Sequence, residues 1–377
     1  MSHKPHLGKI GEEVTIPSPI GSLDYDSDQI LYQMAGGQVL VSNAPESIYD
    51  DGARRADGTC ITGQINSTLY RDEVEGSFRF WAFHHNKSSQ KLKFWIHICN
   101  ITDHTVSLFK TMDGYGDGSA TSAACTATTR FMNAVPERQL LAVIPPRDSF
   151  YFAYTGRGIE PLCSVVYVAE FRVVSLLSGE VAKVLVSHVV TRSEVEDPTP
   201  YAIAGRIART NATATTSDDY RGILQHWGRK GEIRITLTED CPVQCVKLAG
   251  IGYAGEQENL LSRWDVLGNP RERGEVRFII PGKLNKLRQA YWYTEYTIDI
   301  HIANNTRQSI VQTLYGSIGV NPGFVHYQLN HGKTQSYHYN LKTAVRISAD
   351  RDFRLRTMVM PSSWLPLGLF FLTGDGV

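Results

Sequence analysis

Residues 96–106 read Ile-His-Ile-Cys-Asn-Ile-Thr-Asp-His-Thr-Val, and residues 300–310 read Ile-His-Ile-Ala-Asn-Asn-Thr-Arg-Gln-Ser-Ile. At a constant offset, the stretches are identical at two isoleucines, a histidine, an asparagine and a threonine, and Val106 matches Ile310 conservatively. Each stretch alternates apolar residues, reaches an Asn/Thr turn and restarts as a second strand, which is typical of a β-hairpin or a sheet-to-sheet corner. The match predicts two related β modules in one chain.

Length and composition agree with this prediction. The 377 residues suffice for two domains that each bury their own core. Lysine and arginine total 38, and aspartate and glutamate also total 38, so no net field attracts the chain to nucleic acid or an anionic membrane. Glycine (32), tyrosine (18) and phenylalanine (14) are frequent, which favours strands and turns over helices.

The sequence shows no recognisable targeting signal and no disulfide or zinc pattern. The N-terminus lacks the apolar core of a secretory signal, and no apolar run approaches the roughly 20 residues of a membrane span. We therefore expect synthesis in the cytosol, or a leader that is missing from this sequence. The six cysteines are dispersed, and the close pair Cys241 and Cys245 has no second pair to complete a zinc site. Buried free thiols are expected, with one or two later disulfides as the alternative.

The chain in order predicts an N-terminal arm at 1–20, a first antiparallel β-sandwich at 21–200 and a second at 201–377. Asp197-Pro-Thr-Pro200 marks the expected boundary because prolines interrupt strands. The glycine-rich residues 113–119 are expected to form a flexible loop, and residues 119–136 are the best helix candidate. The fold class is therefore all-β, with two tandem antiparallel sandwich modules related by an internal repeat.

The C-terminal stretch Pro366-Leu-Gly-Leu-Phe-Phe-Leu372 predicts a strongly apolar strand. Such a strand should be central in a sheet or covered by a partner. We interpret it as an assembly element whose contact residues are Leu367, Leu369, Phe370, Phe371 and Leu372.

Histidines are the most abundant candidates for chemistry. His84, His85, His97 and His104 fall within 21 residues. If His85 and His97 faced each other across adjacent strands, they could hold zinc or copper. No carboxylate or cysteine lies at ligand spacing, so we expect hydrogen-bonding structural histidines, no metal site and no cofactor.

Catalytic motifs are absent from the sequence. It contains no Gly-x-Ser-x-Gly, no His-Glu-x-x-His and no recognisable carboxylate pair. A triad assembled from distant positions would be invisible at this level. We expect no enzymatic activity and assign no catalytic residues.

Aromatic clusters offer a binding site. Tyr291, Trp292, Tyr293, Tyr337 and Tyr339 could form a platform for sugar rings. The alternative is that they pack in the core. Asn-x-Ser/Thr triplets begin at Asn66, Asn86, Asn100, Asn211 and Asn304, but asparagine and threonine also have a backbone role in turns.

The order of several motifs resembles a set of β-rich envelope and surface proteins of spore-forming Gram-positive bacteria, some with copper-amine-oxidase-type N-terminal domains. The resemblance covers about residues 40–370 as a pattern of strands and turns, and it implies no catalytic residues. It rests on Ala44-Pro-Glu-Ser, Leu69-Tyr-Arg-Asp-Glu-Val-Glu-Gly76, Phe78-Arg79, His85-Asn86, the Asn100 turn, residues 273–277 and the turn at 304–306.

These observations predict a non-enzymatic, self-assembling structural protein of a spore or cell surface, or of a protein inclusion. The expected partner is a second copy of the chain, in an oligomer or lattice. The alternative is a module that binds glycans or a host surface, as part of a virulence or insecticidal factor.

Overall fold

The computed structural model describes residues 9–16, 30–54, 58, 60–203, 207–209, 220–249, 260–264, 269–275, 294–317, 322–360 and 367–374. The chain divides into two compact units, and each is described here by itself. The first unit comprises Gly36–Trp227 and Glu258–Arg288, and the second comprises Met1–Ala35, Gly228–Gln257 and Gln289–Val377.

The first unit consists of two sheets with a helix on one of them. Its described strands and helices are β3 (Gln38–Asn43), β4 (Ser47–Ile48), β5 (Ser67–Glu75), β6 (Ser77–Asn86), β7 (Leu92–Asn100), β8 (Val106–Gly118), α1 (Ala120–Asn133), β9 (Gln139–Ile144), β10 (Ser149–Ala153), β11 (Ser164–Ser175), β12 (Lys183–Arg192), α2 (Thr199–Ile203), β13 (Tyr220–Leu224), β16 (Leu261–Trp264) and β17 (Pro270–Glu275).

The strand order of the first unit is that of a jelly roll. One sheet has the order β5-β12-β7-β10, and the other contains the run β6-β11-β8-β9. Along the chain, the eight strands alternate between the sheets, except that β8 and β9 are neighbours in one sheet. Two interlocked Greek keys of eight strands define this architecture. Side chains from both sheets meet in one apolar core, where the Phe152 ring of β10 lies 6.3 Å from the Phe171 ring of β11, so the unit is a β-sandwich.

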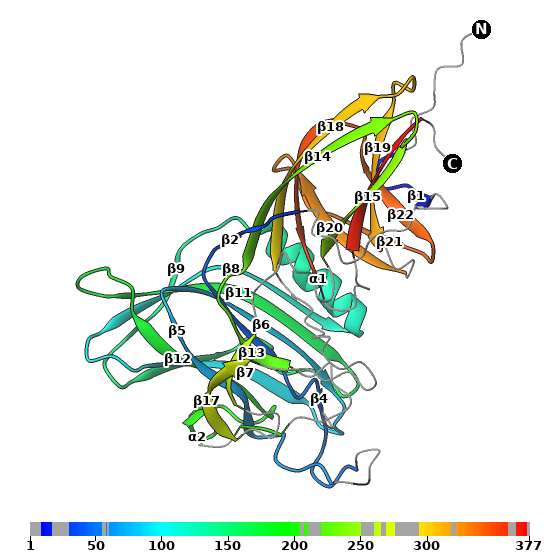
Figure 1. Ribbon diagram of the computed structural model, residues 1–377. Coiled ribbons are helices and arrows are strands. Elements are labelled where there is room, and N and C mark those ends of the chain that lie inside the picture. Colours follow the sequence, from blue (N-terminus) through cyan, green and yellow to red (C-terminus); the bar gives the residue numbers. More distant parts are fainter. Residues whose placement is uncertain are drawn as a thin grey trace. The chain divides into compact units, whose positions relative to one another are not determined.

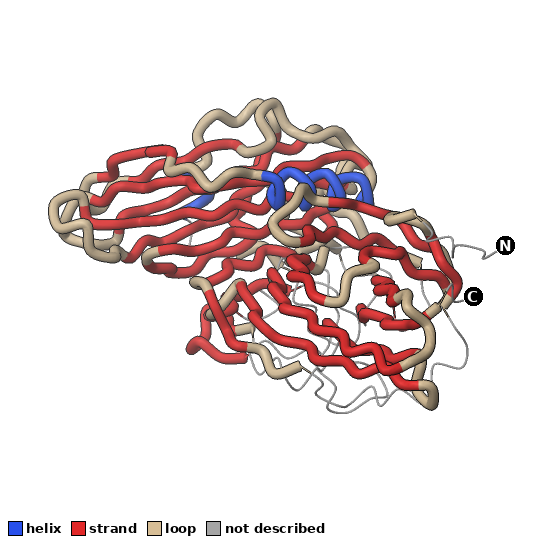
Figure 2. The backbone as a smooth tube through the Cα atoms, turned by 90° about the horizontal axis from the view of Figure 1, so that it is seen from above, coloured by secondary structure: helices blue, strands red, loops and turns tan. Residues whose placement is uncertain are grey.

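Helix α1 lies along the outer face of β8 and β11 (Figure 2). The expected flexible loop at 113–119 is instead largely the end of strand β8. Its glycines have a packing role, because a Cβ at Gly114 would come within 2.1 Å of the Ala127 carbonyl oxygen, and one at Gly116 equally close to that of Ala123. The helix itself was predicted, and Ser119 caps it by accepting a hydrogen bond from the Ser122 N–H.

The second unit is also formed by two sheets (Figure 1). Its described strands are β1 (Glu13–Thr15), β2 (Gln33–Ala35), β14 (Gly228–Thr238), β15 (Val243–Ala249), β18 (Glu295–Asn305), β19 (Val311–Ser317), β20 (Gly323–Leu329), β21 (Gln335–Tyr339), β22 (Thr343–Ser348), β23 (Asp352–Met358) and β24 (Leu367–Thr373).

The second unit has the same jelly-roll connectivity as the first. Its sheets contain the runs β15-β24-β19-β22 and β18-β23-β20-β21, which correspond strand by strand to β5-β12-β7-β10 and β6-β11-β8-β9. The correspondence extends beyond the eight strands, because β3 adds parallel to β6 and β14 adds parallel to β18. The predicted antiparallel sandwiches are therefore observed in coarse form, with a parallel strand added to each.

The boundary between the units differs from the predicted one at residue 200. Strand β13 returns to pair with β3 of the first unit, and the Arg221 guanidinium is buried there. Its Nη1 donates to the carbonyl oxygens of Leu69 and Ala208, both at 2.7 Å. Such long-range pairing leaves no local signal in the sequence. Residues 9–16 of the expected arm belong to the second unit, where β1 pairs with β22.

Three sheet-to-sheet corners share one hydrogen-bonded turn. In each, an asparagine side chain accepts a hydrogen bond from the N–H of the Ser or Thr two positions on and donates to the carbonyl four positions on. The sets are Asn86 with Ser88 and Gln90, Asn100 with Thr102 and His104, and Asn304 with Thr306 and Gln308.

The strand order places the two similar sequence stretches at different positions in their rolls. The Asn100 corner joins the third and fourth strands of one roll, whereas the Asn304 corner joins the second and third strands of the other. The structural counterpart of Asn304 is Asn86. The likeness between 96–106 and 300–310 therefore reflects the same corner chemistry at non-equivalent positions. Asn86 and Asn100 are fully buried, so the corners explain these two Asn-x-Ser/Thr triplets.

Among the described residues, no helix has the length and apolar character needed to cross a membrane.

Candidate functional site

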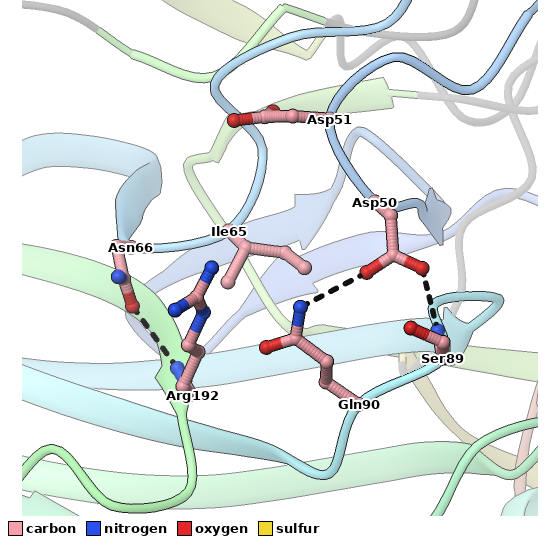
Figure 3. A pocket seen from close by; sticks show the side chains of 7 residues that line it. All are labelled: Asp50, Asp51, Ile65, Asn66, Ser89, Gln90 and Arg192. Atoms are coloured by element: carbon pink, nitrogen blue, oxygen red, sulfur yellow. Dashed lines mark hydrogen bonds between the residues drawn. The ribbon is translucent and has the colours of Figure 1, made fainter.

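A polar pocket of about 390 Å³ opens in the first unit (Figure 3). It lies where the β6–β7 corner, the start of β5, the end of β12 and the loop after β4 meet. Its lining residues are Asp50, Asp51, Ile65, Asn66, Ser89, Gln90 and Arg192.

The pocket is held together by hydrogen bonds between these elements. The Asp50 carboxylate accepts from the Ser89 N–H at 2.7 Å and from the Gln90 amide at 3.2 Å, which ties the loop after β4 to the corner. Asn66 Oδ1 accepts from the backbone N–H of Arg192 at 3.0 Å, which joins the start of β5 to the end of β12. The Asp51 carboxylate is fixed by the Gly63 N–H at 2.7 Å.

The same side chains keep polar atoms available to a ligand. Within the described part of the chain, the second Asp51 carboxylate oxygen, the Asn66 amide nitrogen, the Gln90 amide oxygen and the Arg192 guanidinium make no hydrogen bond to protein. The pocket therefore presents two acceptors and two donors around Ile65. No sequence pattern predicted this pocket, although the Asn86-x-Ser88 turn indicates one of its walls.

The two candidate metal histidines are not brought together. His85 lies on β6 and His97 on β7, which belong to different sheets. Among the described residues, the buried His97 ring has no hydrogen-bond partner, and burial lowers its pKa below the usual value. Among the described residues, no group of three or more His, Cys, Asp or Glu side chains is placed to hold a metal ion.

His85 has an arrangement that resembles a catalytic triad. Its Nδ1 lies 2.6 Å from Ser164 Oγ, and its Nε2 lies 3.3 Å from a Glu46 carboxylate oxygen. Ser164 is only 2% exposed, so its hydroxyl offers no route for a substrate. The trio ties β11, β6 and the loop before β4 together.

A second pair of histidines fills the interior of the first roll. His188 Nε2 lies 2.8 Å from the Tyr154 hydroxyl, and its Nδ1 lies 2.7 Å from Ser42 Oγ. The His84 ring is 5.0 Å from that of His188 and hydrogen-bonds to the Pro45 carbonyl. Burial lowers the pKa of His84 to about 3 and that of His188 well below its usual value, so both rings are neutral at pH 7.

The proposed aromatic platform is not an exposed surface where the structure describes it. Tyr339 is fully buried in the core of the second unit, and the ring of Tyr337 stacks on Tyr327 at 6.0 Å. Alternation along β21 turns both tyrosines inward. The other members of the predicted site, Tyr291, Trp292 and Tyr293, lie outside the described residues.

The C-terminal strand is not an assembly edge. β24 lies between β19 and β15, so both of its edges are hydrogen-bonded within its own sheet. The five predicted contact residues are at most 1% exposed, which corrects their assignment to an interface. Their apolar character is explained by a central position in the sandwich.

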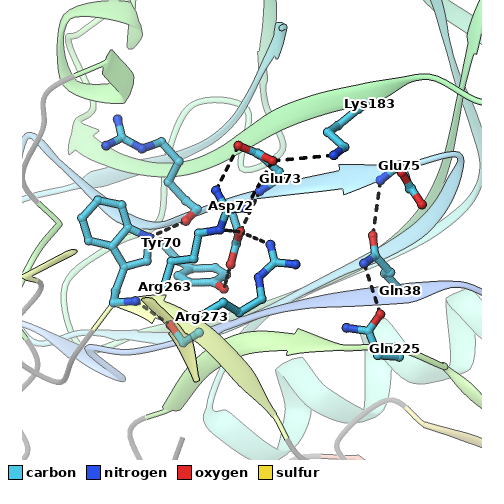
Figure 4. A network of polar contacts seen from close by, with 12 residues as sticks. Gln38, Tyr70, Asp72, Glu73, Glu75, Lys183, Gln225, Arg263 and Arg273 are labelled. Carbon is cyan, nitrogen blue, oxygen red and sulfur yellow. Dashed lines mark hydrogen bonds and ion pairs between the residues drawn. The ribbon is translucent and has the colours of Figure 1, made fainter. Parts of the chain in front are cut away.

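A cluster of ion pairs fastens β16 and β17 to β5 (Figure 4). The buried Asp72 carboxylate accepts from Arg273 at 2.6 Å and from the Tyr70 hydroxyl at 2.8 Å. The Glu73 carboxylate accepts hydrogen bonds from both terminal nitrogens of Arg263, at 3.0 and 3.3 Å. Both β16 and β17 belong to the first unit, so the cluster joins segments of one unit that are distant in sequence.

Comparisons with known proteins add no family assignment. No family model matches the chain, and no curated protein matches it. Among solved structures, the chain is similar to the CUB1-EGF-CUB2 domains of rat MASP-1, with 8% identity over 80% of this chain and 97% of that chain. The TM-score is 0.17, which is too low to support an argument about fold or function.

Proposed function

We propose that the chain is a non-enzymatic structural protein that assembles with copies of itself into a shell or lattice. The observation that carries the proposal is the pair of jelly rolls with one connectivity in a single chain. Jelly rolls occur in viral shells, lectins and cupins, so the architecture admits a shell role but needs support from surfaces.

The interior of the first roll is filled by side chains, which supports a structural role over a cupin-like ligand pocket. Phe80, Tyr154 and Tyr167 occupy the space between the sheets, and the two tyrosine rings stack at 4.4 Å. His188 contacts Phe80 at 5.1 Å between ring centroids. Because aromatic rings are close-packed around the buried histidines, we assign these histidines a structural role.

The surface of the first unit supports self-association. The turn between β11 and β12 exposes Leu176, Leu177 and Val181, and Leu177 is 93% exposed. We call these three residues the apolar tip. An exposed apolar cluster is a common mark of a protein interface, and the zero formal net charge removes the repulsion that would keep copies apart.

The proposal extends to the origin of the two rolls as copies of one module. The supporting observation is the correspondence of the Asn86 and Asn304 corners, together with the parallel strands β3 and β14. Superposition of experimental coordinates of the two units should give a smaller Cα deviation in this register than when Asn100 is paired with Asn304. The opposite result would argue against duplication.

The assembly test compares the full chain with a tip variant, L177E combined with V181E. We expect the wild type to form high-mass species as concentration rises, and the variant to remain smaller at equal concentration, because buried charge disfavours the contact. Light scattering and electron microscopy provide the measurement. L162E is the matched control, since Leu162 is also exposed but lies in the turn before β11.

A wild-type protein that remains a folded monomer at high concentration, from acidic to alkaline pH, would overturn the proposal. If the tip variant assembles as well as the wild type does, the interface lies elsewhere on the molecule. The expected location is a spore or cell surface, or an inclusion.

A further inference from the structure

We propose that the pocket formed by Asp51, Ile65, Asn66, Gln90 and Arg192 binds a neutral sugar ring, either free or as the terminal unit of a glycan. This inference does not depend on self-assembly, because the pocket lies within one unit of a single chain.

Pre-organisation is the first support. Asp51 and Asn66 each use one side-chain oxygen to accept a backbone N–H, from Gly63 and Arg192 respectively. The Gln90 amide nitrogen is held by Asp50. Each side chain is therefore oriented by one end while its other polar end faces no described protein partner, so little side-chain entropy is lost when a ligand binds.

The pattern of donors and acceptors is the second support. A sugar hydroxyl both donates and accepts hydrogen bonds. Asp51 and Gln90 offer oxygens that accept, whereas Asn66 and Arg192 offer N–H groups that donate. Ile65 lies between them, where the C–H face of a ring can pack (Figure 3). A volume of about 390 Å³ lies within the range of small-molecule sites.

Charge selects a neutral ligand over an anion. Two carboxylates, those of Asp50 and Asp51, line the same pocket as the single guanidinium of Arg192. A phosphate or an acidic sugar attracted by Arg192 would come close to the carboxylates of Asp50 and Asp51, and the repulsion between these negative charges would oppose binding. The hydroxyl groups of a neutral sugar ring can donate hydrogen bonds to the carboxylates and accept them from the guanidinium.

The experiment titrates the full chain with methyl glycosides of glucose, galactose, mannose and N-acetylglucosamine, with saturation-transfer NMR and backbone amide shifts as readouts. A single ring in an open pocket should bind with a dissociation constant of roughly 1–10 mM for at least one of them. Comparison with the corresponding free sugar distinguishes a glycan terminus, which has a blocked anomeric hydroxyl, from a free sugar.

Two polarity-reversing variants test the assigned atoms. D51N keeps the oxygen that accepts from Gly63 but replaces the ligand-facing acceptor by a donor, and N66D makes the reverse change. Asn66 has φ +56°, a conformation that aspartate also adopts. Each variant should weaken binding about tenfold or more, because a mismatched pair loses a hydrogen bond and leaves a polar group unpaired.

D103N is the matched control, because Asp103 is an exposed aspartate at the opposite end of β7. It should bind as the wild type does. Three results would overturn the proposal: no binding of any methyl glycoside, equal binding by wild type, D51N and N66D, or binding only of N-acetylneuraminic acid or inorganic phosphate that is lost in R192M. Amide spectra of each variant establish that it is folded.

Discussion

At the scale of single residues, burial keeps four histidines neutral. His84, His97, His188 and His326 are all buried, and burial lowers the pKa of each. An unfolded chain binds protons at these histidines below about pH 6.5, whereas the folded chain binds them only at lower pH. The contribution of these four histidines to the free energy of unfolding is therefore fully present above about pH 6.5 and is lost as the pH falls below that value.

His326 gives a test of this linkage in the second unit. Its pKa is lowered to about 4, and its Nδ1 lies 2.7 Å from Ser336 Oγ. In H326Q, the free energy of unfolding should fall less steeply between pH 6.5 and 4, by up to about 1.4 kcal/mol per pH unit. Urea unfolding at several pH values measures the slope. Q335A, which changes an exposed side chain without a titrating group on the adjacent strand β21, should leave the slope unchanged. An unaltered slope in H326Q would contradict the linkage.

At the scale of elements, short polar motifs fasten strands that are distant in sequence. The asparagine corners turn the chain from one sheet to the other, and the carboxylates of Asp72 and Glu73 hold the segment that contains β16 and β17. Asp72 differs from the exposed pairs on the surface, because its side chain is fully buried and also accepts from Tyr70. Removal of one partner from a buried pair costs more than the loss of an exposed pair.

The pair of variants D72N and D299N separates these two cases. D72N should lower the free energy of unfolding by about 1–3 kcal/mol, because Arg273 and Arg263 lose their buried counter-charge. D299N breaks the pair with Arg354, in which both side chains are 44% exposed, and should cost about 0–1 kcal/mol. Chemical unfolding and hydrogen exchange of the β16 amides provide the measurements. Equal losses in the two variants would show that burial does not set the strength of this cluster.

At the scale of the whole molecule, the two units have separate apolar cores. The core of the second unit includes Leu369 and Phe371 of β24, while that of the first unit includes Phe80 and Val186. Removal of the C-terminal strand would consequently open a sheet between β15 and β19. Such a truncation tests the integrity of the second unit and does not test assembly.

L369D makes this distinction measurable. A carboxylate at this fully buried central position should unfold the second unit, since burial of an unpaired charge costs several kcal/mol. Hydrogen exchange should then lose protection in β19 while β11 remains protected. T373D, at the partly exposed end of the same strand, is the control. Simultaneous loss of protection in both units would show that they fold as one cooperative body.

The sequence by itself determined the class of structure and the local chemistry of the turns. Alternation such as that of Ile233, Ile235 and Leu237 defines strands, and Asn100 and Asn304 define corners, because both signals depend on neighbours within a few residues. The apolar C-terminal strand also required burial, which a central place in a sheet provides. These inferences depend on local periodicity and polarity.

Only the tertiary structure decided which strands pair, where the units divide and which polar groups meet. Gly114 looked like part of a loop, but its meaning came from α1 packing on β8. His188 is 104 residues beyond His84, and Arg192 is 126 residues beyond the Asn66 that it joins at the pocket. Such groups meet because strands from distant segments pair in a sheet. The free energy that selects this pairing is distributed over a whole core, so no short stretch of sequence encodes the pairing.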